Sequence, residues 1–185
     1  ASITEATQSG LLVVVSSGNS AQDANLYTPA NARDAVTVGA FASDGQICST
    51  FSNSGLKVDL SAPGCGYSGF QEVAGIVSLN SKKCGVSGVD SCCAKGAVGE
   101  NGDYCVFKGT SMSAPHVSGA AALAATASLT ATPYMLRQSL IASSRTIGSG
   151  STVLKTTAHG FGKLNLETLV AESSLAPGLK ILSPA

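Results

Sequence analysis

Short apolar runs alternate with longer, helix-like patterns along the 185-residue chain. Residues 11–15 (LLVVV) and 36–40 (VTVGA) are short, β-branched apolar runs, which are typical of strands buried on both faces of a parallel sheet. We expect a third strand at residues 56–60, where Val58 and Leu60 alternate with polar positions, and a fourth at residues 75–79.

Helical signals fall between and after these runs. Residues 2–8 resemble the end of a helix that stops at Gly10, and residues 114–127 form an Ala-rich segment, apolar on all sides, that predicts a buried helix with Pro115 in its first turn. Thr132 and Pro133 open a helix that reaches about Ser143, and residues 164–170 predict a closing helix.

The alternation of strands and helices predicts an α/β domain over residues 1–185. The first strand already has the pattern of a fully buried one, which is unusual at the start of a domain. We therefore expect the N-terminal part of the fold to lie upstream of Ala1.

Composition narrows the classes of partner. Apolar residues make up 44 % of the chain and charged residues 12 %, which favours a globular domain over disorder. Eleven basic and eleven acidic side chains cancel, so neither nucleic acid nor an anionic membrane is expected as a partner. No apolar run approaches the ~20 residues of a membrane span.

Six cysteines predict disulfides and an oxidising, extracellular location. A cysteine metal site is disfavoured, because there is no C-x-x-C spacing and no histidine close by. Five of the six lie in a Gly-, Ser- and Lys-rich stretch at about residues 65–105, which we interpret as a disulfide-stapled insertion. The pairing stays open, although the adjacent Cys92 and Cys93 are expected to have different partners.

Residues 109–119 (GTSMSAPHVSG) carry the strongest chemical signal. Ser111 lies just before the predicted buried helix, where the free N–H groups and the dipole of a helix N-terminus favour negative charge. This suits a nucleophile whose transition state develops an oxyanion.

This run resembles the nucleophile motif of the subtilisin-like serine proteases. Further matches to the family follow in family order: VVVSSGN at residues 13–19, YTPA at 27–30, FSNSG at 51–55, DLSAPG at 59–64 and GFGKLN at 160–165. The second of these is similar to the proteinase K branch. The resemblance implies a mostly parallel central sheet with helices on both faces, of which this chain is the C-terminal portion.

Site residues are carried over position by position from the resemblance. Ser111 would be the nucleophile, and the Asn19 side chain would share the oxyanion with the Ser111 backbone N–H. Ser16, Ser17 and Gly18 would line the pocket for the residue before the scissile bond. Without the resemblance, Asn19 is better explained as a turn residue.

Two further positions, Phe107 and Asp59, each have two possible interpretations. Phe107 matches the position that contacts the first residue after the cut, or is a core aromatic. Asp59 matches a calcium-binding aspartate of the proteinase K branch, with backbone carbonyls from Arg33 to Ala35, or is a strand-end carboxylate. Arg33 departs from the family, where a proline stands. No cofactor is expected for catalysis, and calcium would be structural.

The triad is incomplete in this sequence. The family's aspartate and histidine precede the serine, yet only eighteen residues precede Asn19. His116 and His159 are both predicted to be structural or surface histidines.

The first hypothesis is a secreted endopeptidase that acts on polypeptides and whose N-terminal half is a separate chain or missing segment. The alternatives are an inert binding or scaffold module, and a hydrolase in which another base, such as a lysine, serves Ser111. In the first case, the Cys-rich insertion would form a rim on the leaving-group side.

Overall fold

A computed structural model describes residues 2–66, 75–79, 97–98, 104–127, 130–145 and 155–173. In chain order the elements are α1 (Ile3–Gln8), β1 (Val14–Ser16), the 3₁₀ turn η1 (Ala24–Leu26), β2 (Val36–Phe41), β3 (Leu60–Pro63), β4 (Ile76–Leu79), β5 (Ala97–Val98), β6 (Tyr104–Phe107), α2 (Thr110–Ala127), α3 (Pro133–Ala142) and α4 (Leu166–Ser173).

The main sheet is parallel, with the strand order β1-β2-β3. The two strands expected near residues 11–15 and 36–40 are therefore confirmed. The third begins later than predicted, at Leu60, because residues 55–58 form a turn in which the Val58 N–H donates to the Gly55 carbonyl. Past β3, the Leu164 N–H donates to the Ser61 carbonyl, so the closing segment runs beside this strand.

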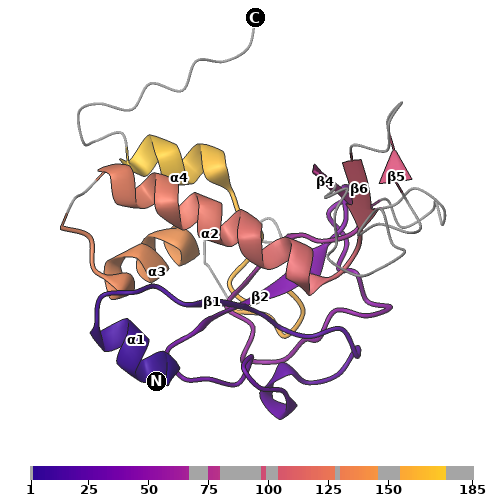
Figure 1. Cartoon of the computed structure of the whole chain (residues 1–185), viewed down its shortest axis with the longest axis horizontal. Coiled ribbons are helices and arrows are strands. Elements are labelled where there is room, and N and C mark those ends of the chain that lie inside the picture. Colours follow the sequence, from indigo (N-terminus) through magenta and orange to yellow (C-terminus); the bar gives the residue numbers. More distant parts are fainter. Residues whose placement is uncertain are drawn as a thin grey trace, which may run out of the picture.

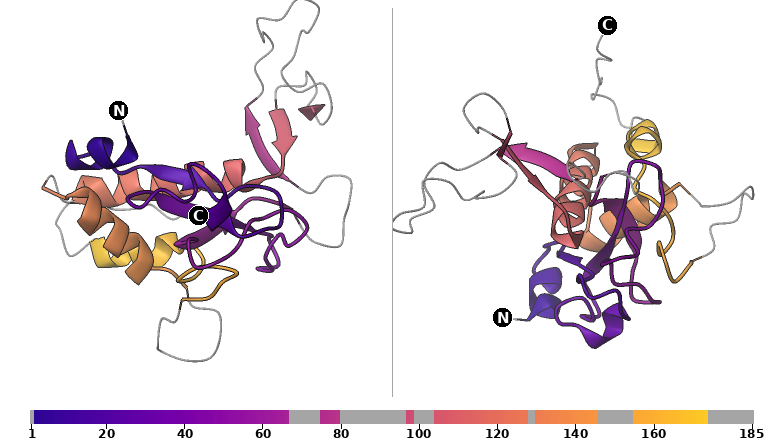
Figure 2. Two further views of the ribbon diagram at one scale, coloured as in Figure 1. Left: turned by 90° about the horizontal axis from the view of Figure 1, so that it is seen from below. Right: turned by 90° about the vertical axis from the view of Figure 1, so that its right-hand side faces the viewer.

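The fourth strand, β4, lies in a separate antiparallel sheet with the order β4-β6-β5. Figure 2 shows β4 and β6 standing away from the parallel sheet and its helices. The Cys-rich stretch lies mostly outside the described residues, including Cys84, Cys92 and Cys93. Within the described part, Cys48 bonds to Cys65 and Cys105 is also in a disulfide, as the cysteine count predicts.

Three helices cover one side of the parallel sheet. α2 packs against all three of its strands and against α3 and α4, and the three helices lie close together in Figure 1. α1 begins at Ser2, whose side chain accepts the Glu5 N–H while the Glu5 carboxylate accepts the Ser2 N–H. α3 has Thr132 as its N-cap, as expected.

Two expectations for α2 need correction. The helix begins at Thr110, so Ser111 is inside its first turn and Pro115 is an interior residue. It is also buried on one face only. Small residues such as Ala120 and Ala124 meet the sheet, whereas Gly119 and Leu123 on the other face are not covered by the part of the chain that the structure describes.

The largest core cluster lies between α2 and the parallel sheet. Its buried members are Val36, Val38, Leu60, Ala62, Val117, Ala120, Ala121, Ala124, Leu140 and Leu169. The alanines let the helix backbone approach the strands closely, and this brings the first turn of α2 to the carboxyl end of β1.

Replacing a core leucine tests this packing. Leu60 is fully buried, so Leu60→Ala should lower the free energy of unfolding in urea by about 2–5 kcal/mol. Leu56→Ala is the matched control, because Leu56 is 71 % exposed and its loss should change stability by at most about 0.5 kcal/mol. Equal effects of the two substitutions would contradict this core.

Candidate active site

Asn53 holds the loop after β1, which carries Asn19. The Asn53 side chain is fully buried. Its Oδ1 accepts the N–H groups of Ser20 at 2.9 Å and Gln22 at 3.1 Å, and its Nδ2 donates to the Ser17 carbonyl at 3.0 Å. The Asn53 side chain thus gives hydrogen-bond partners to backbone groups on both sides of Asn19, where the loop has no neighbouring strand to provide them.

Thr110, the first residue of α2, ties this loop to the helix. Its backbone N–H and its hydroxyl both donate to Asn19 Oδ1, each at 2.9 Å, and its hydroxyl accepts the Gly18 N–H at 3.2 Å. A backbone N–H can only donate, so the atom facing Thr110 must be the amide oxygen. The Asn19 Nδ2 group is therefore turned away from Thr110 and, among the described residues, has no acceptor.

Ser111 follows at the second position of the helix and is exposed. The preceding Gly109 has a φ of +148°, and a Cβ built on it would lie 3.4 Å from Asn19 Nδ2. The side-chain N–H groups of Asn19 thus lie beside Gly109, two residues before Ser111. A helix leaves the N–H groups of its first turn without an internal partner, so the Ser111 backbone N–H and Asn19 Nδ2 are the candidate donors for an oxyanion.

The end of β3 supports the same helix turn. Ser113 is fully buried, and its hydroxyl donates to the Ala62 carbonyl at 3.0 Å. Gly64 accepts the Gly109 N–H at 2.8 Å, and a Cβ at Gly64 would collide with Ser113 Oγ. Sequence reasoning missed Ser113 and the role of Asn53, because only the fold shows that these polar side chains are buried and fully bonded.

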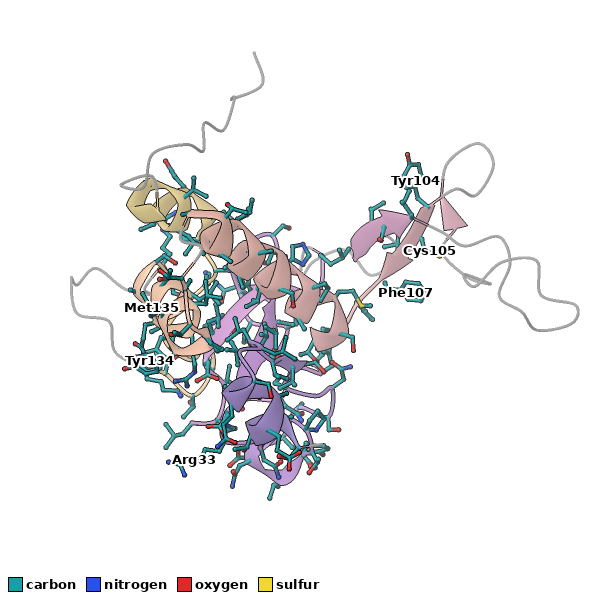
Figure 3. The ribbon with its side chains drawn as sticks, turned by 60° about the vertical axis from the view of Figure 1, so that its left-hand side comes forward. Arg33, Tyr104, Cys105, Phe107, Tyr134 and Met135 are labelled. Atoms are coloured by element: carbon teal, nitrogen blue, oxygen red, sulfur yellow. A yellow bond between two sulfur atoms is a disulfide. The ribbon has the colours of Figure 1, made fainter. Side chains whose placement is uncertain are left out.

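A pocket of about 350 Å³ opens beside the candidate nucleophile. It is lined by Ile76, Val77, Ser78, Phe107, Ser111, Met112, Pro115 and His116. Phe107 is 44 % exposed, so it is not a core aromatic. Figure 3 shows it where β6 leads into α2, with Tyr104 and Cys105 farther out on the same strand.

The three residues expected to line the pocket before the scissile bond differ in burial. Ser17 is fully buried, and its hydroxyl donates to the Asn53 carbonyl at 3.1 Å. Its side chain is therefore held within the fold, and a contact between this position and substrate stays a prediction. Ser16 and Gly18 are half-buried, and their contact with substrate stays a prediction.

Neither histidine forms a hydrogen bond to Ser111 among the described residues, although His116 lines the same pocket. His116 Nδ1 lies 2.8 Å from the Met112 carbonyl, which can only accept, so this nitrogen is committed to the helix backbone. His159 is buried, and burial together with the nearby Lys163 cation lowers its pKa to about 4. His159 is thus neutral at pH 7.

The calcium site expected at Asp59 does not fit the residues around it. Asp59 Oδ1 accepts a hydrogen bond from Arg137 Nη2 at 2.7 Å, and Oδ2 accepts the Thr37 N–H at 2.9 Å. Both oxygens of this buried carboxylate already have partners, one of them cationic. Arg33 lies exposed at the outer surface (Figure 3), and Ala35 is fully buried.

A family model describing the subtilases matches residues 1–165. The chain belongs to the subtilase family. It is 37 % identical over 119 residues to the subtilisin-like proteinase Mp1 of Magnaporthiopsis poae, an alignment that covers 64 % of this chain and 23 % of that protein. It is 32 % identical over 165 residues to alkaline elastase YaB of a Bacillus species, covering 89 % of this chain and 34 % of the elastase.

A solved protease from Pseudoalteromonas arctica superposes with a TM-score of 0.73 at 28 % identity, over 92 % of this chain and 45 % of that one. The predicted fold, α/β with a parallel sheet and helices, is therefore confirmed. The chain spans about a quarter of the length of the first curated relatives that it matches.

Thr110 provides a direct test of the link between Asn19 and α2. Thr110→Val deletes the hydroxyl and leaves the Gly18 N–H without its acceptor, so the free energy of unfolding should fall by about 1–3 kcal/mol. Thr110→Ser keeps the hydroxyl and should lose clearly less. Urea unfolding of the two variants measures the difference, and equal losses would show that the hydroxyl contributes nothing.

His159 predicts a dependence of stability on acid pH. As pH falls below about 6.5, the unfolded chain takes up a proton on this residue while the folded chain stays neutral until about pH 4. The free energy of unfolding should therefore drop by on the order of 2 kcal/mol between pH 7 and pH 4 because of this group. His159→Gln should flatten that slope and His116→Gln should not, as measured by urea unfolding at several pH values.

Proposed function

We propose that this chain is the nucleophile-bearing part of a secreted serine endopeptidase, which hydrolyses peptide bonds through an acyl-enzyme on Ser111. The observation that carries the proposal is the orientation of Asn19. Thr110 holds its amide oxygen, so that its N–H groups are presented next to an exposed serine at a helix N-terminus.

The chemistry follows from these groups. Ser111 Oγ attacks the scissile carbonyl carbon, and the carbonyl oxygen becomes an oxyanion that accepts from Asn19 Nδ2 and the Ser111 backbone N–H. The leaving part of the polypeptide departs past the pocket lined by Phe107 and Met112. The general base takes the Ser111 hydroxyl proton and gives it to the leaving nitrogen, so the tetrahedral intermediate collapses and expels the amine; a water activated by the same base then releases the acyl group.

The general base and its orienting acid come from outside this chain, from an upstream segment or a second polypeptide. The sequence has two histidines, and in the described part of the chain no hydrogen bond joins either imidazole to Ser111. The described residues that line the pocket include no lysine, which weighs against a lysine-dependent hydrolase.

The main sheet offers a place for such a segment. The Val13 carbonyl and the Ser17 N–H bond to β2, so the backbone groups of Val14 and Ser16 point to the open edge of β1. Beside this edge lies an apolar groove of about 210 Å³. It is lined by Leu12, Val14, Ser118, Ala121, Ala122, Ala125 and Leu136.

The proposed extracellular location rests on the disulfides and on the names of two relatives. The described cysteines are in disulfides, which persist in oxidising compartments. Two relatives, from a Thermus species and from Dichelobacter nodosus, are named extracellular serine proteinase and extracellular basic protease. Among the described residues, no helix has both the length and the apolar character that a bilayer crossing requires.

Intact mass spectrometry with a fluorophosphonate tests the proposal. The protein isolated from its source is labelled while folded and then denatured without reduction. Its mass spectrum should show one adduct on Ser111, and either a second polypeptide or an upstream extension of this chain. The recombinant 185-residue chain should label at least about 10³-fold more slowly, because a serine hydroxyl without its base is a weak nucleophile. Ser111→Ala is the control that must not label.

The outcomes separate the three hypotheses. Rapid labelling of the 185-residue chain alone would contradict an external base. Absence of an adduct on the isolated protein would favour an inert binding module. In a labelled protein, Asn19→Ala should slow the reaction by about 10²–10³-fold, since it removes one oxyanion donor.

A further inference from the structure

Asp59 is a carboxylate that the fold has almost completely removed from water. It stands immediately before β3, and its side chain is 2 % exposed. Its backbone N–H donates to the Thr37 carbonyl, and its side-chain Oδ2 accepts the Thr37 N–H, so both ends of the residue are tied to β2. A buried charge in this position destabilises the fold unless positive charge reaches it.

Two cationic side chains from other parts of the chain reach the remaining oxygen. Arg137, on α3, donates to Asp59 Oδ1 at 2.7 Å, and Lys155 Nζ lies 3.7 Å from the same atom. Both cations are partly buried, with exposed fractions of 31 % and 25 %. Ion pairs that are partly shielded from water are less screened than surface pairs.

Lys155 also belongs to the closing segment, residues 155–165, in which Lys163 and Leu164 pair with β3. Its ammonium lies 4.9 Å from the centre of the Phe161 ring, and the Phe161 N–H donates to the Asp59 carbonyl at 2.7 Å. Asp59 is therefore the point at which β2, α3 and the closing segment meet.

The local charge balance disfavours an additional cation. Lys57 lies nearby, and its pKa is lowered by burial and by the cations Arg137 and Lys155, while Asp59 and Asp34 act in the opposite direction. Three cations and two carboxylates already interact here. A divalent ion would have to displace Arg137 and would then face the other positive charges.

We propose that Arg137 and Lys155 replace the metal ion at Asp59, so that the chain stabilises this junction with its own side chains and does not respond to calcium. The resemblance to the proteinase K branch places a calcium-binding aspartate here, whereas the contacts of this chain place a salt bridge. The proposal is independent of the chemistry at Ser111, and either can fail without the other.

Thermal unfolding with and without calcium is the first test. A site with a dissociation constant of about 10⁻³ M would raise the Tm by about 2–4 °C at about 5 mM calcium. We expect the Tm of the 185-residue chain in calcium to match that in excess EDTA within about 1 °C. A rise of several degrees would overturn the proposal, because it would show that a metal stabilises the chain despite the salt bridge.

The second test removes the cation. Arg137→Met keeps much of the side-chain volume and leaves the carboxylate short of positive charge, so the Tm should fall by about 3–8 °C. Arg145→Met is the matched control, since Arg145 is exposed, and it should change the Tm by about 1 °C or less.

A double-mutant cycle identifies the partner. Asp59→Asn combined with Arg137→Met should lower the Tm by clearly less than the sum of the two single substitutions, because the double variant leaves no unpaired buried charge. Simple additivity, or an Arg137→Met variant as stable as the Arg145→Met control, would show that the salt bridge does not stabilise the junction. The calcium titration remains decisive if a single variant does not fold.

Discussion

Two hydrogen bonds from Thr110 to the amide oxygen of Asn19 join the two parts of the candidate active site. One part is the loop at the carboxyl end of β1, and the other is the first turn of α2, which lies some ninety positions later in the chain. The bonds orient the amide, and with it the N–H groups that are proposed to bind the oxyanion. Asn53 beneath the loop and Ser113 beneath the helix fix the two partners against the sheet.

The placement of this junction depends on the packing of α2. Alanine and valine on its buried face let the helix lie close to the parallel strands, and Thr110 and Ser113 are buried as a result. Pro115 lies inside the helix and has no N–H to donate to the Ser111 carbonyl, so this carbonyl lacks its usual partner within the helix. The side chains of Ser113 and Asn19 hold the same turn from the sheet side, through the Ala62 carbonyl and the Thr110 N–H.

The junction at Asp59 follows a different principle. There, the same chain joins β2, α3 and the closing segment through one buried carboxylate and two cations. Cations supplied by the chain itself are present whatever the metal content of the solution, whereas a metal site depends on it.

Local patterns in the sequence determined much of this protein. The β-branched runs predicted β1 and β2, and the Thr132–Pro133 pair predicted the start of α3. The run around Ser111 and residues 13–19 carried the resemblance to the family, and with it the proposal for a nucleophile and an oxyanion donor. These features depend on neighbouring residues, which a sequence displays directly.

Only the tertiary structure decided the rest. It moved the start of β3 to Leu60 and placed β4 in a separate sheet, because strand boundaries and partners depend on hydrogen bonds between distant segments. The fold also buries Ser17, and it brings Arg137 into a salt bridge with Asp59, which is seventy-eight positions away in the sequence. The function of a polar side chain depends on which charges and hydrogen-bonding groups the fold brings to it, and sequence separation does not reveal them.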